Sequence, residues 1–318
     1  MTEVHYAGAT IRLYQGESVL DGLLRTGHAI ANGCRSGVCQ SCVMVSASDE
    51  VPATARRGLS DAQLALDHFL ACQCVPQSAI SVMPASHTEL RTRASVVGKQ
   101  LLAVDIVRLR LQADISYRAG QYLTLWKDGQ VARSYSLASH PLTDEHLEFH
   151  IRLLEQGRFS QWVWQSLQVG DSVDIQGPMG KCFYTGRPDQ PMLLAATGTG
   201  LAPLYGVLKD ALLQRHRARI DLVLAARRAD QFYLLKELRA LAARHEQLKL
   251  HLLVLEGSGP DLMEADVYSY CQQHFTELRD TKIYLCGADS FVKKLRRQLF
   301  LAGAGMSNIA ADAFLPCG

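Results

Sequence analysis

Three closely spaced cysteines are the residues of this sequence whose type and spacing point most clearly to a chemical role. Cys34, Cys39 and Cys42 follow the spacing C-x4-C-x2-C, and further thiols come later, within residues 70–74. With this spacing one loop wraps a [2Fe–2S] cluster, and a fourth thiolate arrives from further along the chain. The cysteines therefore predict a carrier of single electrons.

A structural zinc site is the main alternative for these thiols. Structural zinc typically takes two C-x2-C pairs, or one such pair with a later pair of histidines. Here the two spacings share Cys39, and the last ligand stands alone. The pattern favours the cluster, and chemistry alone leaves both Cys72 and Cys74 open as its fourth ligand.

Short elements around the cysteines are expected to hold them in place. Ser18 is a suitable N-cap for the apolar helix pattern that follows it, and Ser60 can cap a short helix that runs through Phe69 and delivers Cys72. A strand or a hairpin is predicted at residues 4–13, and strands are predicted at 43–45 and 79–83. Short strands packed with helices give an α+β domain, here over residues 1–88.

The composition limits the class of protein. A chain of 318 residues is long enough for two or three domains, and a formal net charge of +2 gives no argument for binding nucleic acid or a membrane surface. No signal-peptide pattern and no membrane-spanning apolar run is evident. Nine cysteines favour a reducing compartment, the cytoplasm, and metal or redox use. Cys182 and Cys271 are expected to be small buried residues, and Cys317 is left open.

The middle of the chain predicts a second domain, over residues 93–186. A polar segment without periodicity, residues 87–93, is expected to be the linker that precedes it. Short strand-like stretches follow at residues 94–98, 106–111, 122–126, 147–153 and 172–175. Several short strands of this kind predict a small antiparallel barrel.

Three motifs in this barrel resemble the flavin-binding domain of the ferredoxin-reductase superfamily. They are Arg133-Ser134-Tyr135-Ser136, then Gly157-Arg158-Phe159-Ser160 after His150-Ile151-Arg152, and finally Gly177-Pro178-Met179-Gly180. Each motif alone is weak, because Arg-x-Tyr-Ser also fits an ordinary half-exposed strand. Together, in this order and after a cluster domain, they indicate FAD binding.

The residue types in these motifs suit a flavin dinucleotide. Arg133 can hold the diphosphate through charge-assisted hydrogen bonds, and Tyr135 can lie against the isoalloxazine ring. Ser136 can offer a hydrogen bond near the reactive flavin nitrogen. Ser160 is expected to begin a helix whose N-terminus binds the second phosphate. The remaining predicted FAD contacts from these motifs are Ser134, Gly157 and Gly177.

The strand that carries His150 and Arg152 lines the flavin edge in the family, so both residues are predicted cofactor contacts. The alternative for His150 is an ordinary strand histidine. Ala119 stands where the family commonly has proline, and Gln156 replaces a usual glycine. These departures are mild and leave the prediction of FAD binding in place.

The last part of the chain, residues 187–318, changes to alternating strands and helices. Strands are predicted at 192–196, 220–226, 248–255 and 282–286, and helices after residue 203, at 232–244 and at 289–301. This alternation predicts a doubly wound parallel sheet of the dinucleotide-binding type.

Two turns and the chain end carry the predicted nucleotide site. The turn Thr197-Gly198-Thr199-Gly200 joins a strand to a helix, where glycines let the backbone approach a pyrophosphate. Pro203 stands where the usual fingerprint has its third glycine, yet this turn and Cys286-Gly287 resemble the two nucleotide motifs of the same superfamily. The resemblance places Cys286 beside the nicotinamide and Phe314 near the flavin, although Phe314 also fits a plain terminal strand. The predicted catalytic residues are Ser136, Cys286 and Phe314.

The preference for NADH or NADPH depends on the end of the second strand of this domain. An acid there favours the ribose hydroxyl, and an arginine favours a 2′-phosphate. Arg227 is a predicted contact that discriminates little, because relatives that use either nucleotide carry one arginine there. Arg228 favours NADPH and Asp230 opposes it, so the sequence predicts NADH with NADPH as the alternative.

Over nearly its whole length the chain resembles the reductase components of bacterial aromatic-ring-hydroxylating oxygenases. The resemblance implies a plant-type [2Fe–2S] ferredoxin domain with a β-grasp fold, an FAD-binding β-barrel and an NAD(P)-binding domain. It also implies Cys72 rather than Cys74 as the fourth cluster ligand, and FAD rather than FMN. A hydride carries two electrons and a cluster passes one at a time, so a flavin must stand between them.

The predicted function is electron transfer from NAD(P)H through FAD and the cluster to an oxygenase component or an intermediary Rieske-type ferredoxin. The alternatives with the same redox core are a reductase for a soluble diiron monooxygenase or for a deoxysugar dehydrase. A redox-sensing module with a vestigial flavoprotein half is less favoured, because the flavin and nucleotide motifs are intact.

Overall fold

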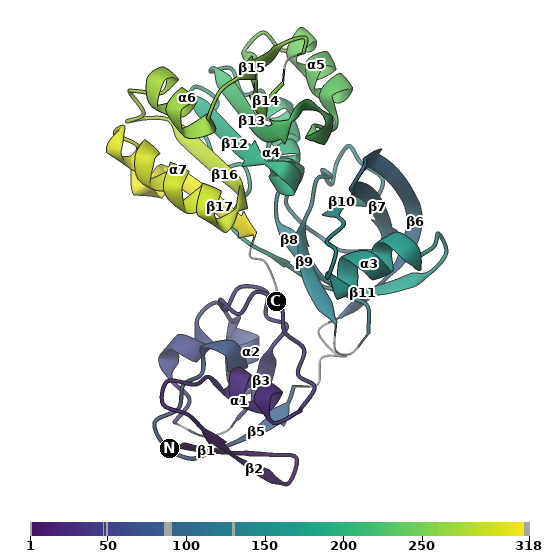
Figure 1. Ribbon diagram of the computed structural model, residues 1–318, viewed down its shortest axis with the longest axis vertical. Helices are drawn as coiled ribbons and strands as arrows, with labels where there is room; N and C mark the ends of the chain where they lie inside the picture. The colour runs from purple at the N-terminus through teal and green to yellow at the C-terminus, as the bar shows by residue number, and fades with distance from the viewer. Residues whose placement is uncertain are drawn as a thin grey trace.

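The computed structural model of the chain describes residues 2–46, 48, 50–85, 91–128, 131–257 and 259–314. Its strands form three sheets that follow one another along the sequence and occupy three lobes (Figure 1). This confirms the predicted order of an α+β domain, an antiparallel barrel and a parallel-sheet domain. Residues 86–90, which include most of the expected linker, and Cys317 lie outside the described residues, and the boundaries at 88, 93 and 187 stay predictions.

The N-terminal domain is a five-stranded sheet with the order β2-β1-β5-β3-β4. Its elements are β1 (Thr2–Tyr6), β2 (Ala9–Leu13), α1 (Val19–Arg25), β3 (Val43–Val45), α2 (Asp61–Ala65), β4 (His68–Leu70) and β5 (Ile80–Pro84). Strands β1 and β2 form the predicted hairpin, and Ser18 caps α1 by accepting the N–H of Asp21. Ser60 caps α2 and exchanges bonds with Gln63 in a capping box.

One prediction in this domain is wrong. The helix capped by Ser60 ends at Ala65 and does not continue through Phe69, which lies in β4 and pairs with Met44 of β3. A short 3-10 turn, Ala71–Gln73, delivers Cys72 instead. Phe69 is a strand residue whose side chain lies in the core of the sheet, whereas Leu64 and Leu66, which also suggested the helix, are exposed.

The middle domain is an antiparallel barrel of six strands in the order β10-β7-β6-β11-β8-β9. Its elements are β6 (Thr92–Ala103), β7 (Ile106–Gln112), β8 (Tyr122–Trp126), β9 (Ala132–Ser136), β10 (Leu147–Arg152), α3 (Arg158–Gln165) and β11 (Ser172–Met179). A bridge between Leu137 and Phe149 brings the end of β9 to β10 and closes the barrel. Alternate side chains of the strands, among them Leu109, Leu125 and Ile175, fill its interior.

The C-terminal domain is a six-stranded parallel sheet with the order β15-β14-β13-β12-β16-β17. Its elements are β12 (Met192–Thr197), α4 (Leu201–Leu213), β13 (Ile220–Arg228), α5 (Leu235–Arg244), β14 (Leu248–Glu256), β15 (Leu262–Glu264), α6 (Val267–His274), β16 (Lys282–Ala288), α7 (Asp289–Leu301) and β17 (Ile309–Phe314). Helices α4 and α5 pack on one face, and α6, which contains the buried Cys271, packs with α7 on the other. The sheet is doubly wound, as predicted.

Three details of this domain differ from the sequence prediction. Strand β13 runs on through Arg227 and Arg228, and α5 begins at Leu235 rather than at residue 232. Strand β15 and helix α6 had no clear signal in the sequence.

Among the described residues no helix is long and apolar enough to cross a membrane.

The barrel contacts each of the two other domains through backbone as well as side chains. A parallel bridge between Asn32 and Val131 links the N-terminal domain to the start of β9, and Ala31 packs there with Trp126 and Ala132. On the other side of the barrel, a Cβ at Gly206 of α4 would lie 2.9 Å from the Leu137 carbonyl oxygen. The barrel therefore touches both of the other domains.

Candidate functional site

The loop of residues 33–42, called the cluster loop below, points several backbone N–H groups at its own thiols. The amide nitrogens of Ser36, Val38 and Cys39 lie 3.3–3.4 Å from Cys34 Sγ, and the amide of Cys34 lies 3.3 Å from Cys39 Sγ. The Cys39 thiol and these donors lower the pKa of Cys34 below its usual value. Donors aimed at sulfur stabilise thiolates, so the loop suits negatively charged sulfur ligands.

The four predicted cluster ligands are arranged as two pairs. Cys34 lies against Cys39, and Cys42 interacts with Cys72. A [2Fe–2S] cluster takes two thiolates on each iron, whereas a single structural metal ion needs more ligands converging on one point. The pairs fit a binuclear cluster better than the zinc alternative.

The remaining thiol of this region, Cys74, lies apart from the two pairs. It is fully buried in the apolar core of the N-terminal domain, and burial raises its pKa to about 12. Cys72 is half-buried, and the neighbouring Gln73 side chain bonds to the Arg35 carbonyl across the cluster loop at 3.1 Å. These positions support Cys72 as the fourth ligand, and the assignment stays a prediction.

Strand β9 carries the predicted flavin motif. The ring of Tyr135 packs against Phe159 of α3, with the ring centroids 5.5 Å apart. Arg133 donates from Nη1 to the carbonyl oxygens of Asn32, at 3.0 Å, and Ala132, at 2.7 Å. The guanidinium therefore reaches the N-terminal domain, a placement that the sequence did not predict. Its role at the FAD diphosphate stays a prediction.

Helix α3 begins earlier than the sequence predicts. Its N-cap is Gly157, and Ser160 lies within the first turn. The Ser160 hydroxyl accepts the N–H of Leu154 and donates to the Gly157 carbonyl, both at 3.1 Å, and a Cβ at Gly157 would lie 2.4 Å from it. Ser160 thus ties the preceding turn to the helix. In the third motif, Gly177 has a φ of +129°, which side chains rarely allow.

Strand β10 brings His150 and Arg152 against the C-terminal domain. The His150 ring is completely buried, with Nδ1 3.1 Å from Tyr233 Oη and Nε2 3.0 Å from the Glu148 carboxylate. A Cβ at Gly198 would lie 2.9 Å from Arg152 Nη1, so Arg152 covers the predicted nucleotide turn. The strand therefore borders that turn, while both ring nitrogens of His150 already have protein partners.

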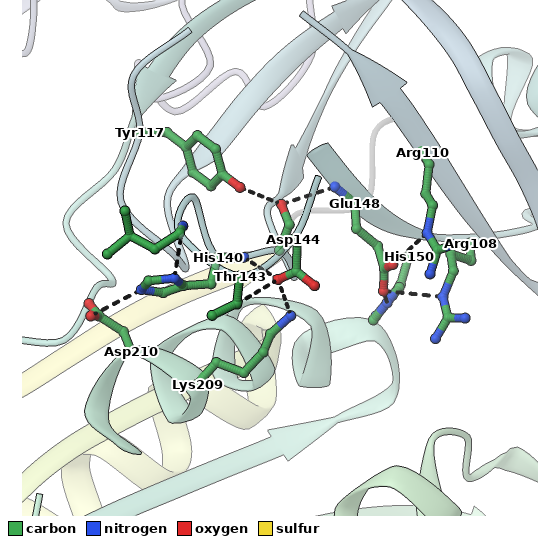
Figure 2. A network of polar contacts seen from close by, with 12 residues as sticks. Arg108, Arg110, Tyr117, His140, Thr143, Asp144, Glu148, His150, Lys209 and Asp210 are labelled. Carbon is green, nitrogen blue, oxygen red and sulfur yellow. Dashed lines mark hydrogen bonds and ion pairs between the residues drawn. The ribbon is translucent and has the colours of Figure 1, made fainter. Parts of the chain in front are cut away.

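A network of polar contacts joins the barrel to helix α4 (Figure 2). Lys209 of α4 donates to the Asp144 carboxylate at 2.6 Å, and the same carboxylate accepts the backbone N–H of His140 at 2.6 Å. The His140 ring faces Asp210 of α4 at 3.3 Å. These contacts hold the loop after β9 against the C-terminal domain and so fix the relation between the flavin and nucleotide motifs.

Glu148 is the charged centre of the neighbouring part of Figure 2. Its carboxylate oxygens lie 3.1 Å from Arg108 Nε, 3.0 Å from Arg110 Nε and 3.0 Å from His150 Nε2. Burial by itself would raise the pKa of Glu148, but these partners outweigh it and lower the pKa to about 2. The carboxylate is therefore ionised at neutral pH. It links the arginines of β7 to β10 next to His150.

The two predicted nucleotide turns pack directly on each other. The turn Gly198–Gly200 follows β12, and a Cβ at Gly200 would lie 2.1 Å from the Cys286 carbonyl oxygen at the end of β16. Gly287 has a φ of +142°, and a Cβ there would lie 2.4 Å from Thr197 Oγ1. The strand order reverses between β12 and β16, which is where doubly wound sheets bind dinucleotides.

Substitution of Gly200 by alanine is expected to disrupt this packing, because the new methyl group meets backbone atoms that cannot move aside. We expect the free energy of unfolding to fall by about 2–4 kcal/mol, and NADH-driven flavin reduction to slow at least about tenfold. Thermal denaturation and stopped-flow absorbance measure the two effects. Gly305→Ala is the matched control, because the nearest atoms lie 3.7–4.0 Å from its Cβ position. Equal behaviour of the two variants would contradict the packing argument.

A carboxylate that the sequence reasoning missed joins the predicted catalytic residues. Ser136 Oγ donates to Asp312 Oδ2 at 2.7 Å, and Asp312 pairs with Cys286 across β16 and β17. Burial raises the pKa of Asp312, with the Ser136 hydrogen bond acting in the opposite direction. Cys182 is buried as predicted, but its Sγ lies 3.4 Å from Cys286 Sγ, so it belongs to the same group. Phe314 ends β17 and is half-buried.

The arginines after β13 differ in their surroundings. The Arg227 guanidinium is exposed and makes no hydrogen bond or ion pair with any residue that the structure describes. Arg228 forms an ion pair with Asp230 at 2.8 Å. The extra cation that favoured NADPH is thus paired with the acid beside it, whereas Arg227 has no such partner among the residues that the structure describes.

Comparisons with known proteins match all three parts of the chain. Residues 4–77 match the 2Fe-2S iron-sulfur cluster binding domain, residues 93–184 the oxidoreductase FAD-binding domain, and residues 194–297 the oxidoreductase NAD-binding domain. The ferredoxin–NAD(P)+ reductase component of the naphthalene 1,2-dioxygenase system of Pseudomonas putida is 31% identical over 95% of both chains. The chain belongs to this family of reductase components.

Further relatives show how far the family extends. A crystal structure of an Amycolatopsis cytochrome P450 reductase is 26% identical, with a TM-score of 0.70 over 99% of both chains. A CDP-6-deoxy-L-threo-D-glycero-4-hexulose-3-dehydrase reductase of Yersinia pseudotuberculosis is 25% identical over 99% of this chain and 98% of its own. The comparisons confirm an NAD(P)H-dependent oxidoreductase with sites for FAD, a [2Fe–2S] cluster and NAD. The residues assigned to these sites stay predictions.

Proposed function

We propose that this reductase takes a hydride from NADH and passes its two electrons singly to an aromatic-ring oxygenase or to a Rieske-type ferredoxin that serves one. The observation that carries the proposal is the position of the hairpin β8–β9. Its Ser136 is bonded to Asp312 of the nucleotide domain, and its Arg133 is bonded to Asn32 beside the cluster loop. One hairpin of the flavin barrel thus contacts the side that receives hydride and the side that holds the cluster.

The residues of this chain have separate tasks in the proposed reaction. FAD supplies the conversion between two-electron and one-electron chemistry. Arg133, Ser134 and Tyr135 would hold FAD, while the turns 197–200 and 286–287 would position the nicotinamide. The Ser136 hydroxyl donates its only hydrogen bond to Asp312, so it would offer one to the reactive flavin nitrogen, the role predicted for it, only after the bond to Asp312 is released.

Electrons would leave from the side of the cluster that carries Cys34 and Cys72. Both residues are half-buried, whereas Cys39 and Cys42 are buried. The backbone of the cluster loop at Val38 faces the barrel, where its carbonyl accepts the Tyr122 hydroxyl at 2.8 Å. The acceptor protein is therefore proposed to dock over Cys34 and Cys72.

Sequence identity favours a dioxygenase system as the acceptor of the electrons. The dioxygenase relative is more similar to this chain than the dehydrase reductase, at 31% against 25% identity. A dehydrase or a soluble diiron monooxygenase stays the second candidate. No disulfide joins any of the described cysteines, which fits the proposed cytoplasmic location.

Anaerobic titration with NADH and with NADPH tests this function. NADH is expected to bleach the flavin and cluster absorption rapidly and to produce a cluster electron paramagnetic signal, and NADPH to do so more slowly. Flavin released by heat should chromatograph as FAD. Slow or absent reduction by both nucleotides would favour the sensor alternative, and release of FMN would contradict the cofactor assignment.

A further inference from the structure

Two neighbouring side chains of β8 hold the cluster loop by its backbone. Tyr122 Oη donates to the Val38 carbonyl at 2.8 Å, and Thr124 Oγ1 donates to the Cys39 carbonyl at 2.9 Å. Successive side chains of a strand alternate between faces, so Tyr122 and Thr124 share the face that meets the N-terminal domain. The second of these contacts is made to the backbone of a predicted cluster ligand.

Thr124 also bonds within the flavin barrel. It lies opposite Ser134 in the pairing of β8 with β9, and the two hydroxyl oxygens are 2.9 Å apart. A hydroxyl has one proton, and that of Thr124 goes to Cys39, so Ser134 must be the donor of this second bond. The result is a directed chain of hydrogen bonds from Ser134 through Thr124 to the Cys39 carbonyl.

The Thr124 side chain has no exposed surface, although its residue type is usually found at the protein surface. A buried threonine whose donor and acceptor functions are both used, one in each of two domains, fixes the distance between those domains. Arg133 adds a third contact between the same partners, at Asn32.

We propose that Thr124 is a positioning residue for electron transfer from flavin to cluster: it holds the Cys39 side of the cluster loop against the flavin-binding strand. The inference rests on the proposed function. Each NADH gives up two electrons and one proton in all. The two electrons would pass from flavin to cluster one after the other and reduce the acceptor twice, and the proton would go to water. The hydroxyls of Thr124 and Ser134 are neither oxidised nor reduced, because they only hold the loop in position.

The experiment compares Thr124→Val with the wild-type holoenzyme. Valine keeps the shape of threonine but cannot bond to Cys39, whereas Thr124→Ser keeps the hydroxyl. In anaerobic stopped-flow measurements with NADH, Thr124→Val should reduce its flavin at the wild-type rate and its cluster at least about fivefold more slowly, and Thr124→Ser should restore most of the rate. The cluster electron paramagnetic signal after full reduction by dithionite should match the wild type.

A second readout does not depend on turnover. Hydrogen exchange of the backbone amides in residues 32–40 should be faster in Thr124→Val than in the wild type, because the loop is less firmly held against β8. Tyr122→Phe, which removes only the bond to Val38, should increase this exchange and leave the Ser134–Thr124–Cys39 chain in place. If Thr124→Val does not fold with its cofactors, Thr124→Ala, which also lacks the hydroxyl, replaces it in the same two measurements.

Wild-type cluster reduction and unchanged amide exchange in Thr124→Val would overturn the proposal. So would faster exchange without slower cluster reduction, because Thr124 would then be a structural contact only. Failure of the wild-type protein to reduce its flavin with NADH or NADPH would instead contradict the proposed function and would be seen before any variant is compared.

Discussion

Replacing Cys72 with serine is expected to abolish the visible absorption and the electron paramagnetic signal of the cluster. Cys72 stands with Cys42 as one of the two thiol pairs, so its loss leaves one iron with a single thiolate. The iron content of the purified protein should fall from about two atoms per chain to near zero. Flavin reduction by NADH should persist in the variant, because Cys72 takes no part in the hydride site.

Cys74→Ser is the matched comparison, two residues away. Cys74 lies in the apolar core with Leu70, so serine places a hydroxyl there and should lower the free energy of unfolding by about 1–3 kcal/mol. Its iron content and cluster signal should nevertheless equal those of the wild type. A variant pattern in which Cys74→Ser loses the signal and Cys72→Ser keeps it would reverse the ligand assignment.

Features set by neighbouring residues could be predicted from the sequence. The cap of α1 at Ser18 and the capping box between Ser60 and Gln63 depend on three-residue spacings, which the chain displays directly. The cluster loop is likewise a local pattern. The alternation of strands and helices gave the parallel sheet, because each βα unit buries its apolar residues in a regular order.

Features that depend on distant partners could not be predicted in this way. Ser136 and Asp312 are 176 positions apart, and Cys182 and Cys286 are 104 apart. Asp312 had no signal beyond its place two residues before the predicted Phe314, and Cys182 looked like an ordinary buried cysteine. The incorrect prediction of a helix at Phe69 has a related cause. A short run of apolar residues fits a helix or a strand equally well, and only the pairing of Phe69 with the distant Met44 decides for the strand.

Asp312→Asn is expected to slow flavin reduction by NADH roughly tenfold to hundredfold, because the orientation of a reacting group is sensitive to small displacements. In the wild type the Asp312 carboxylate accepts the hydrogen bond of the Ser136 hydroxyl and lies beside Cys286. The asparagine oxygen can still accept that bond, but without the charge it holds the hydroxyl less firmly. Stopped-flow reduction of the flavin measures the effect, and cluster content should not change.

The same substitution should change the pH dependence of stability in a defined direction. Burial raises the pKa of Asp312 in the folded chain above its unfolded value, so the folded state binds the proton more tightly between those two values. The contribution of this group to the free energy of unfolding therefore decreases as pH rises through that interval. Asparagine does not ionise, so Asp312→Asn should be at least as stable as the wild type at pH 8 although its flavin reduction is slower.

Asp280→Asn, at an exposed carboxylate paired with Arg187, should change neither property. A slower Asp312→Asn variant that is also less stable at pH 8 would mean that Asp312 supports the fold and not the hydride site.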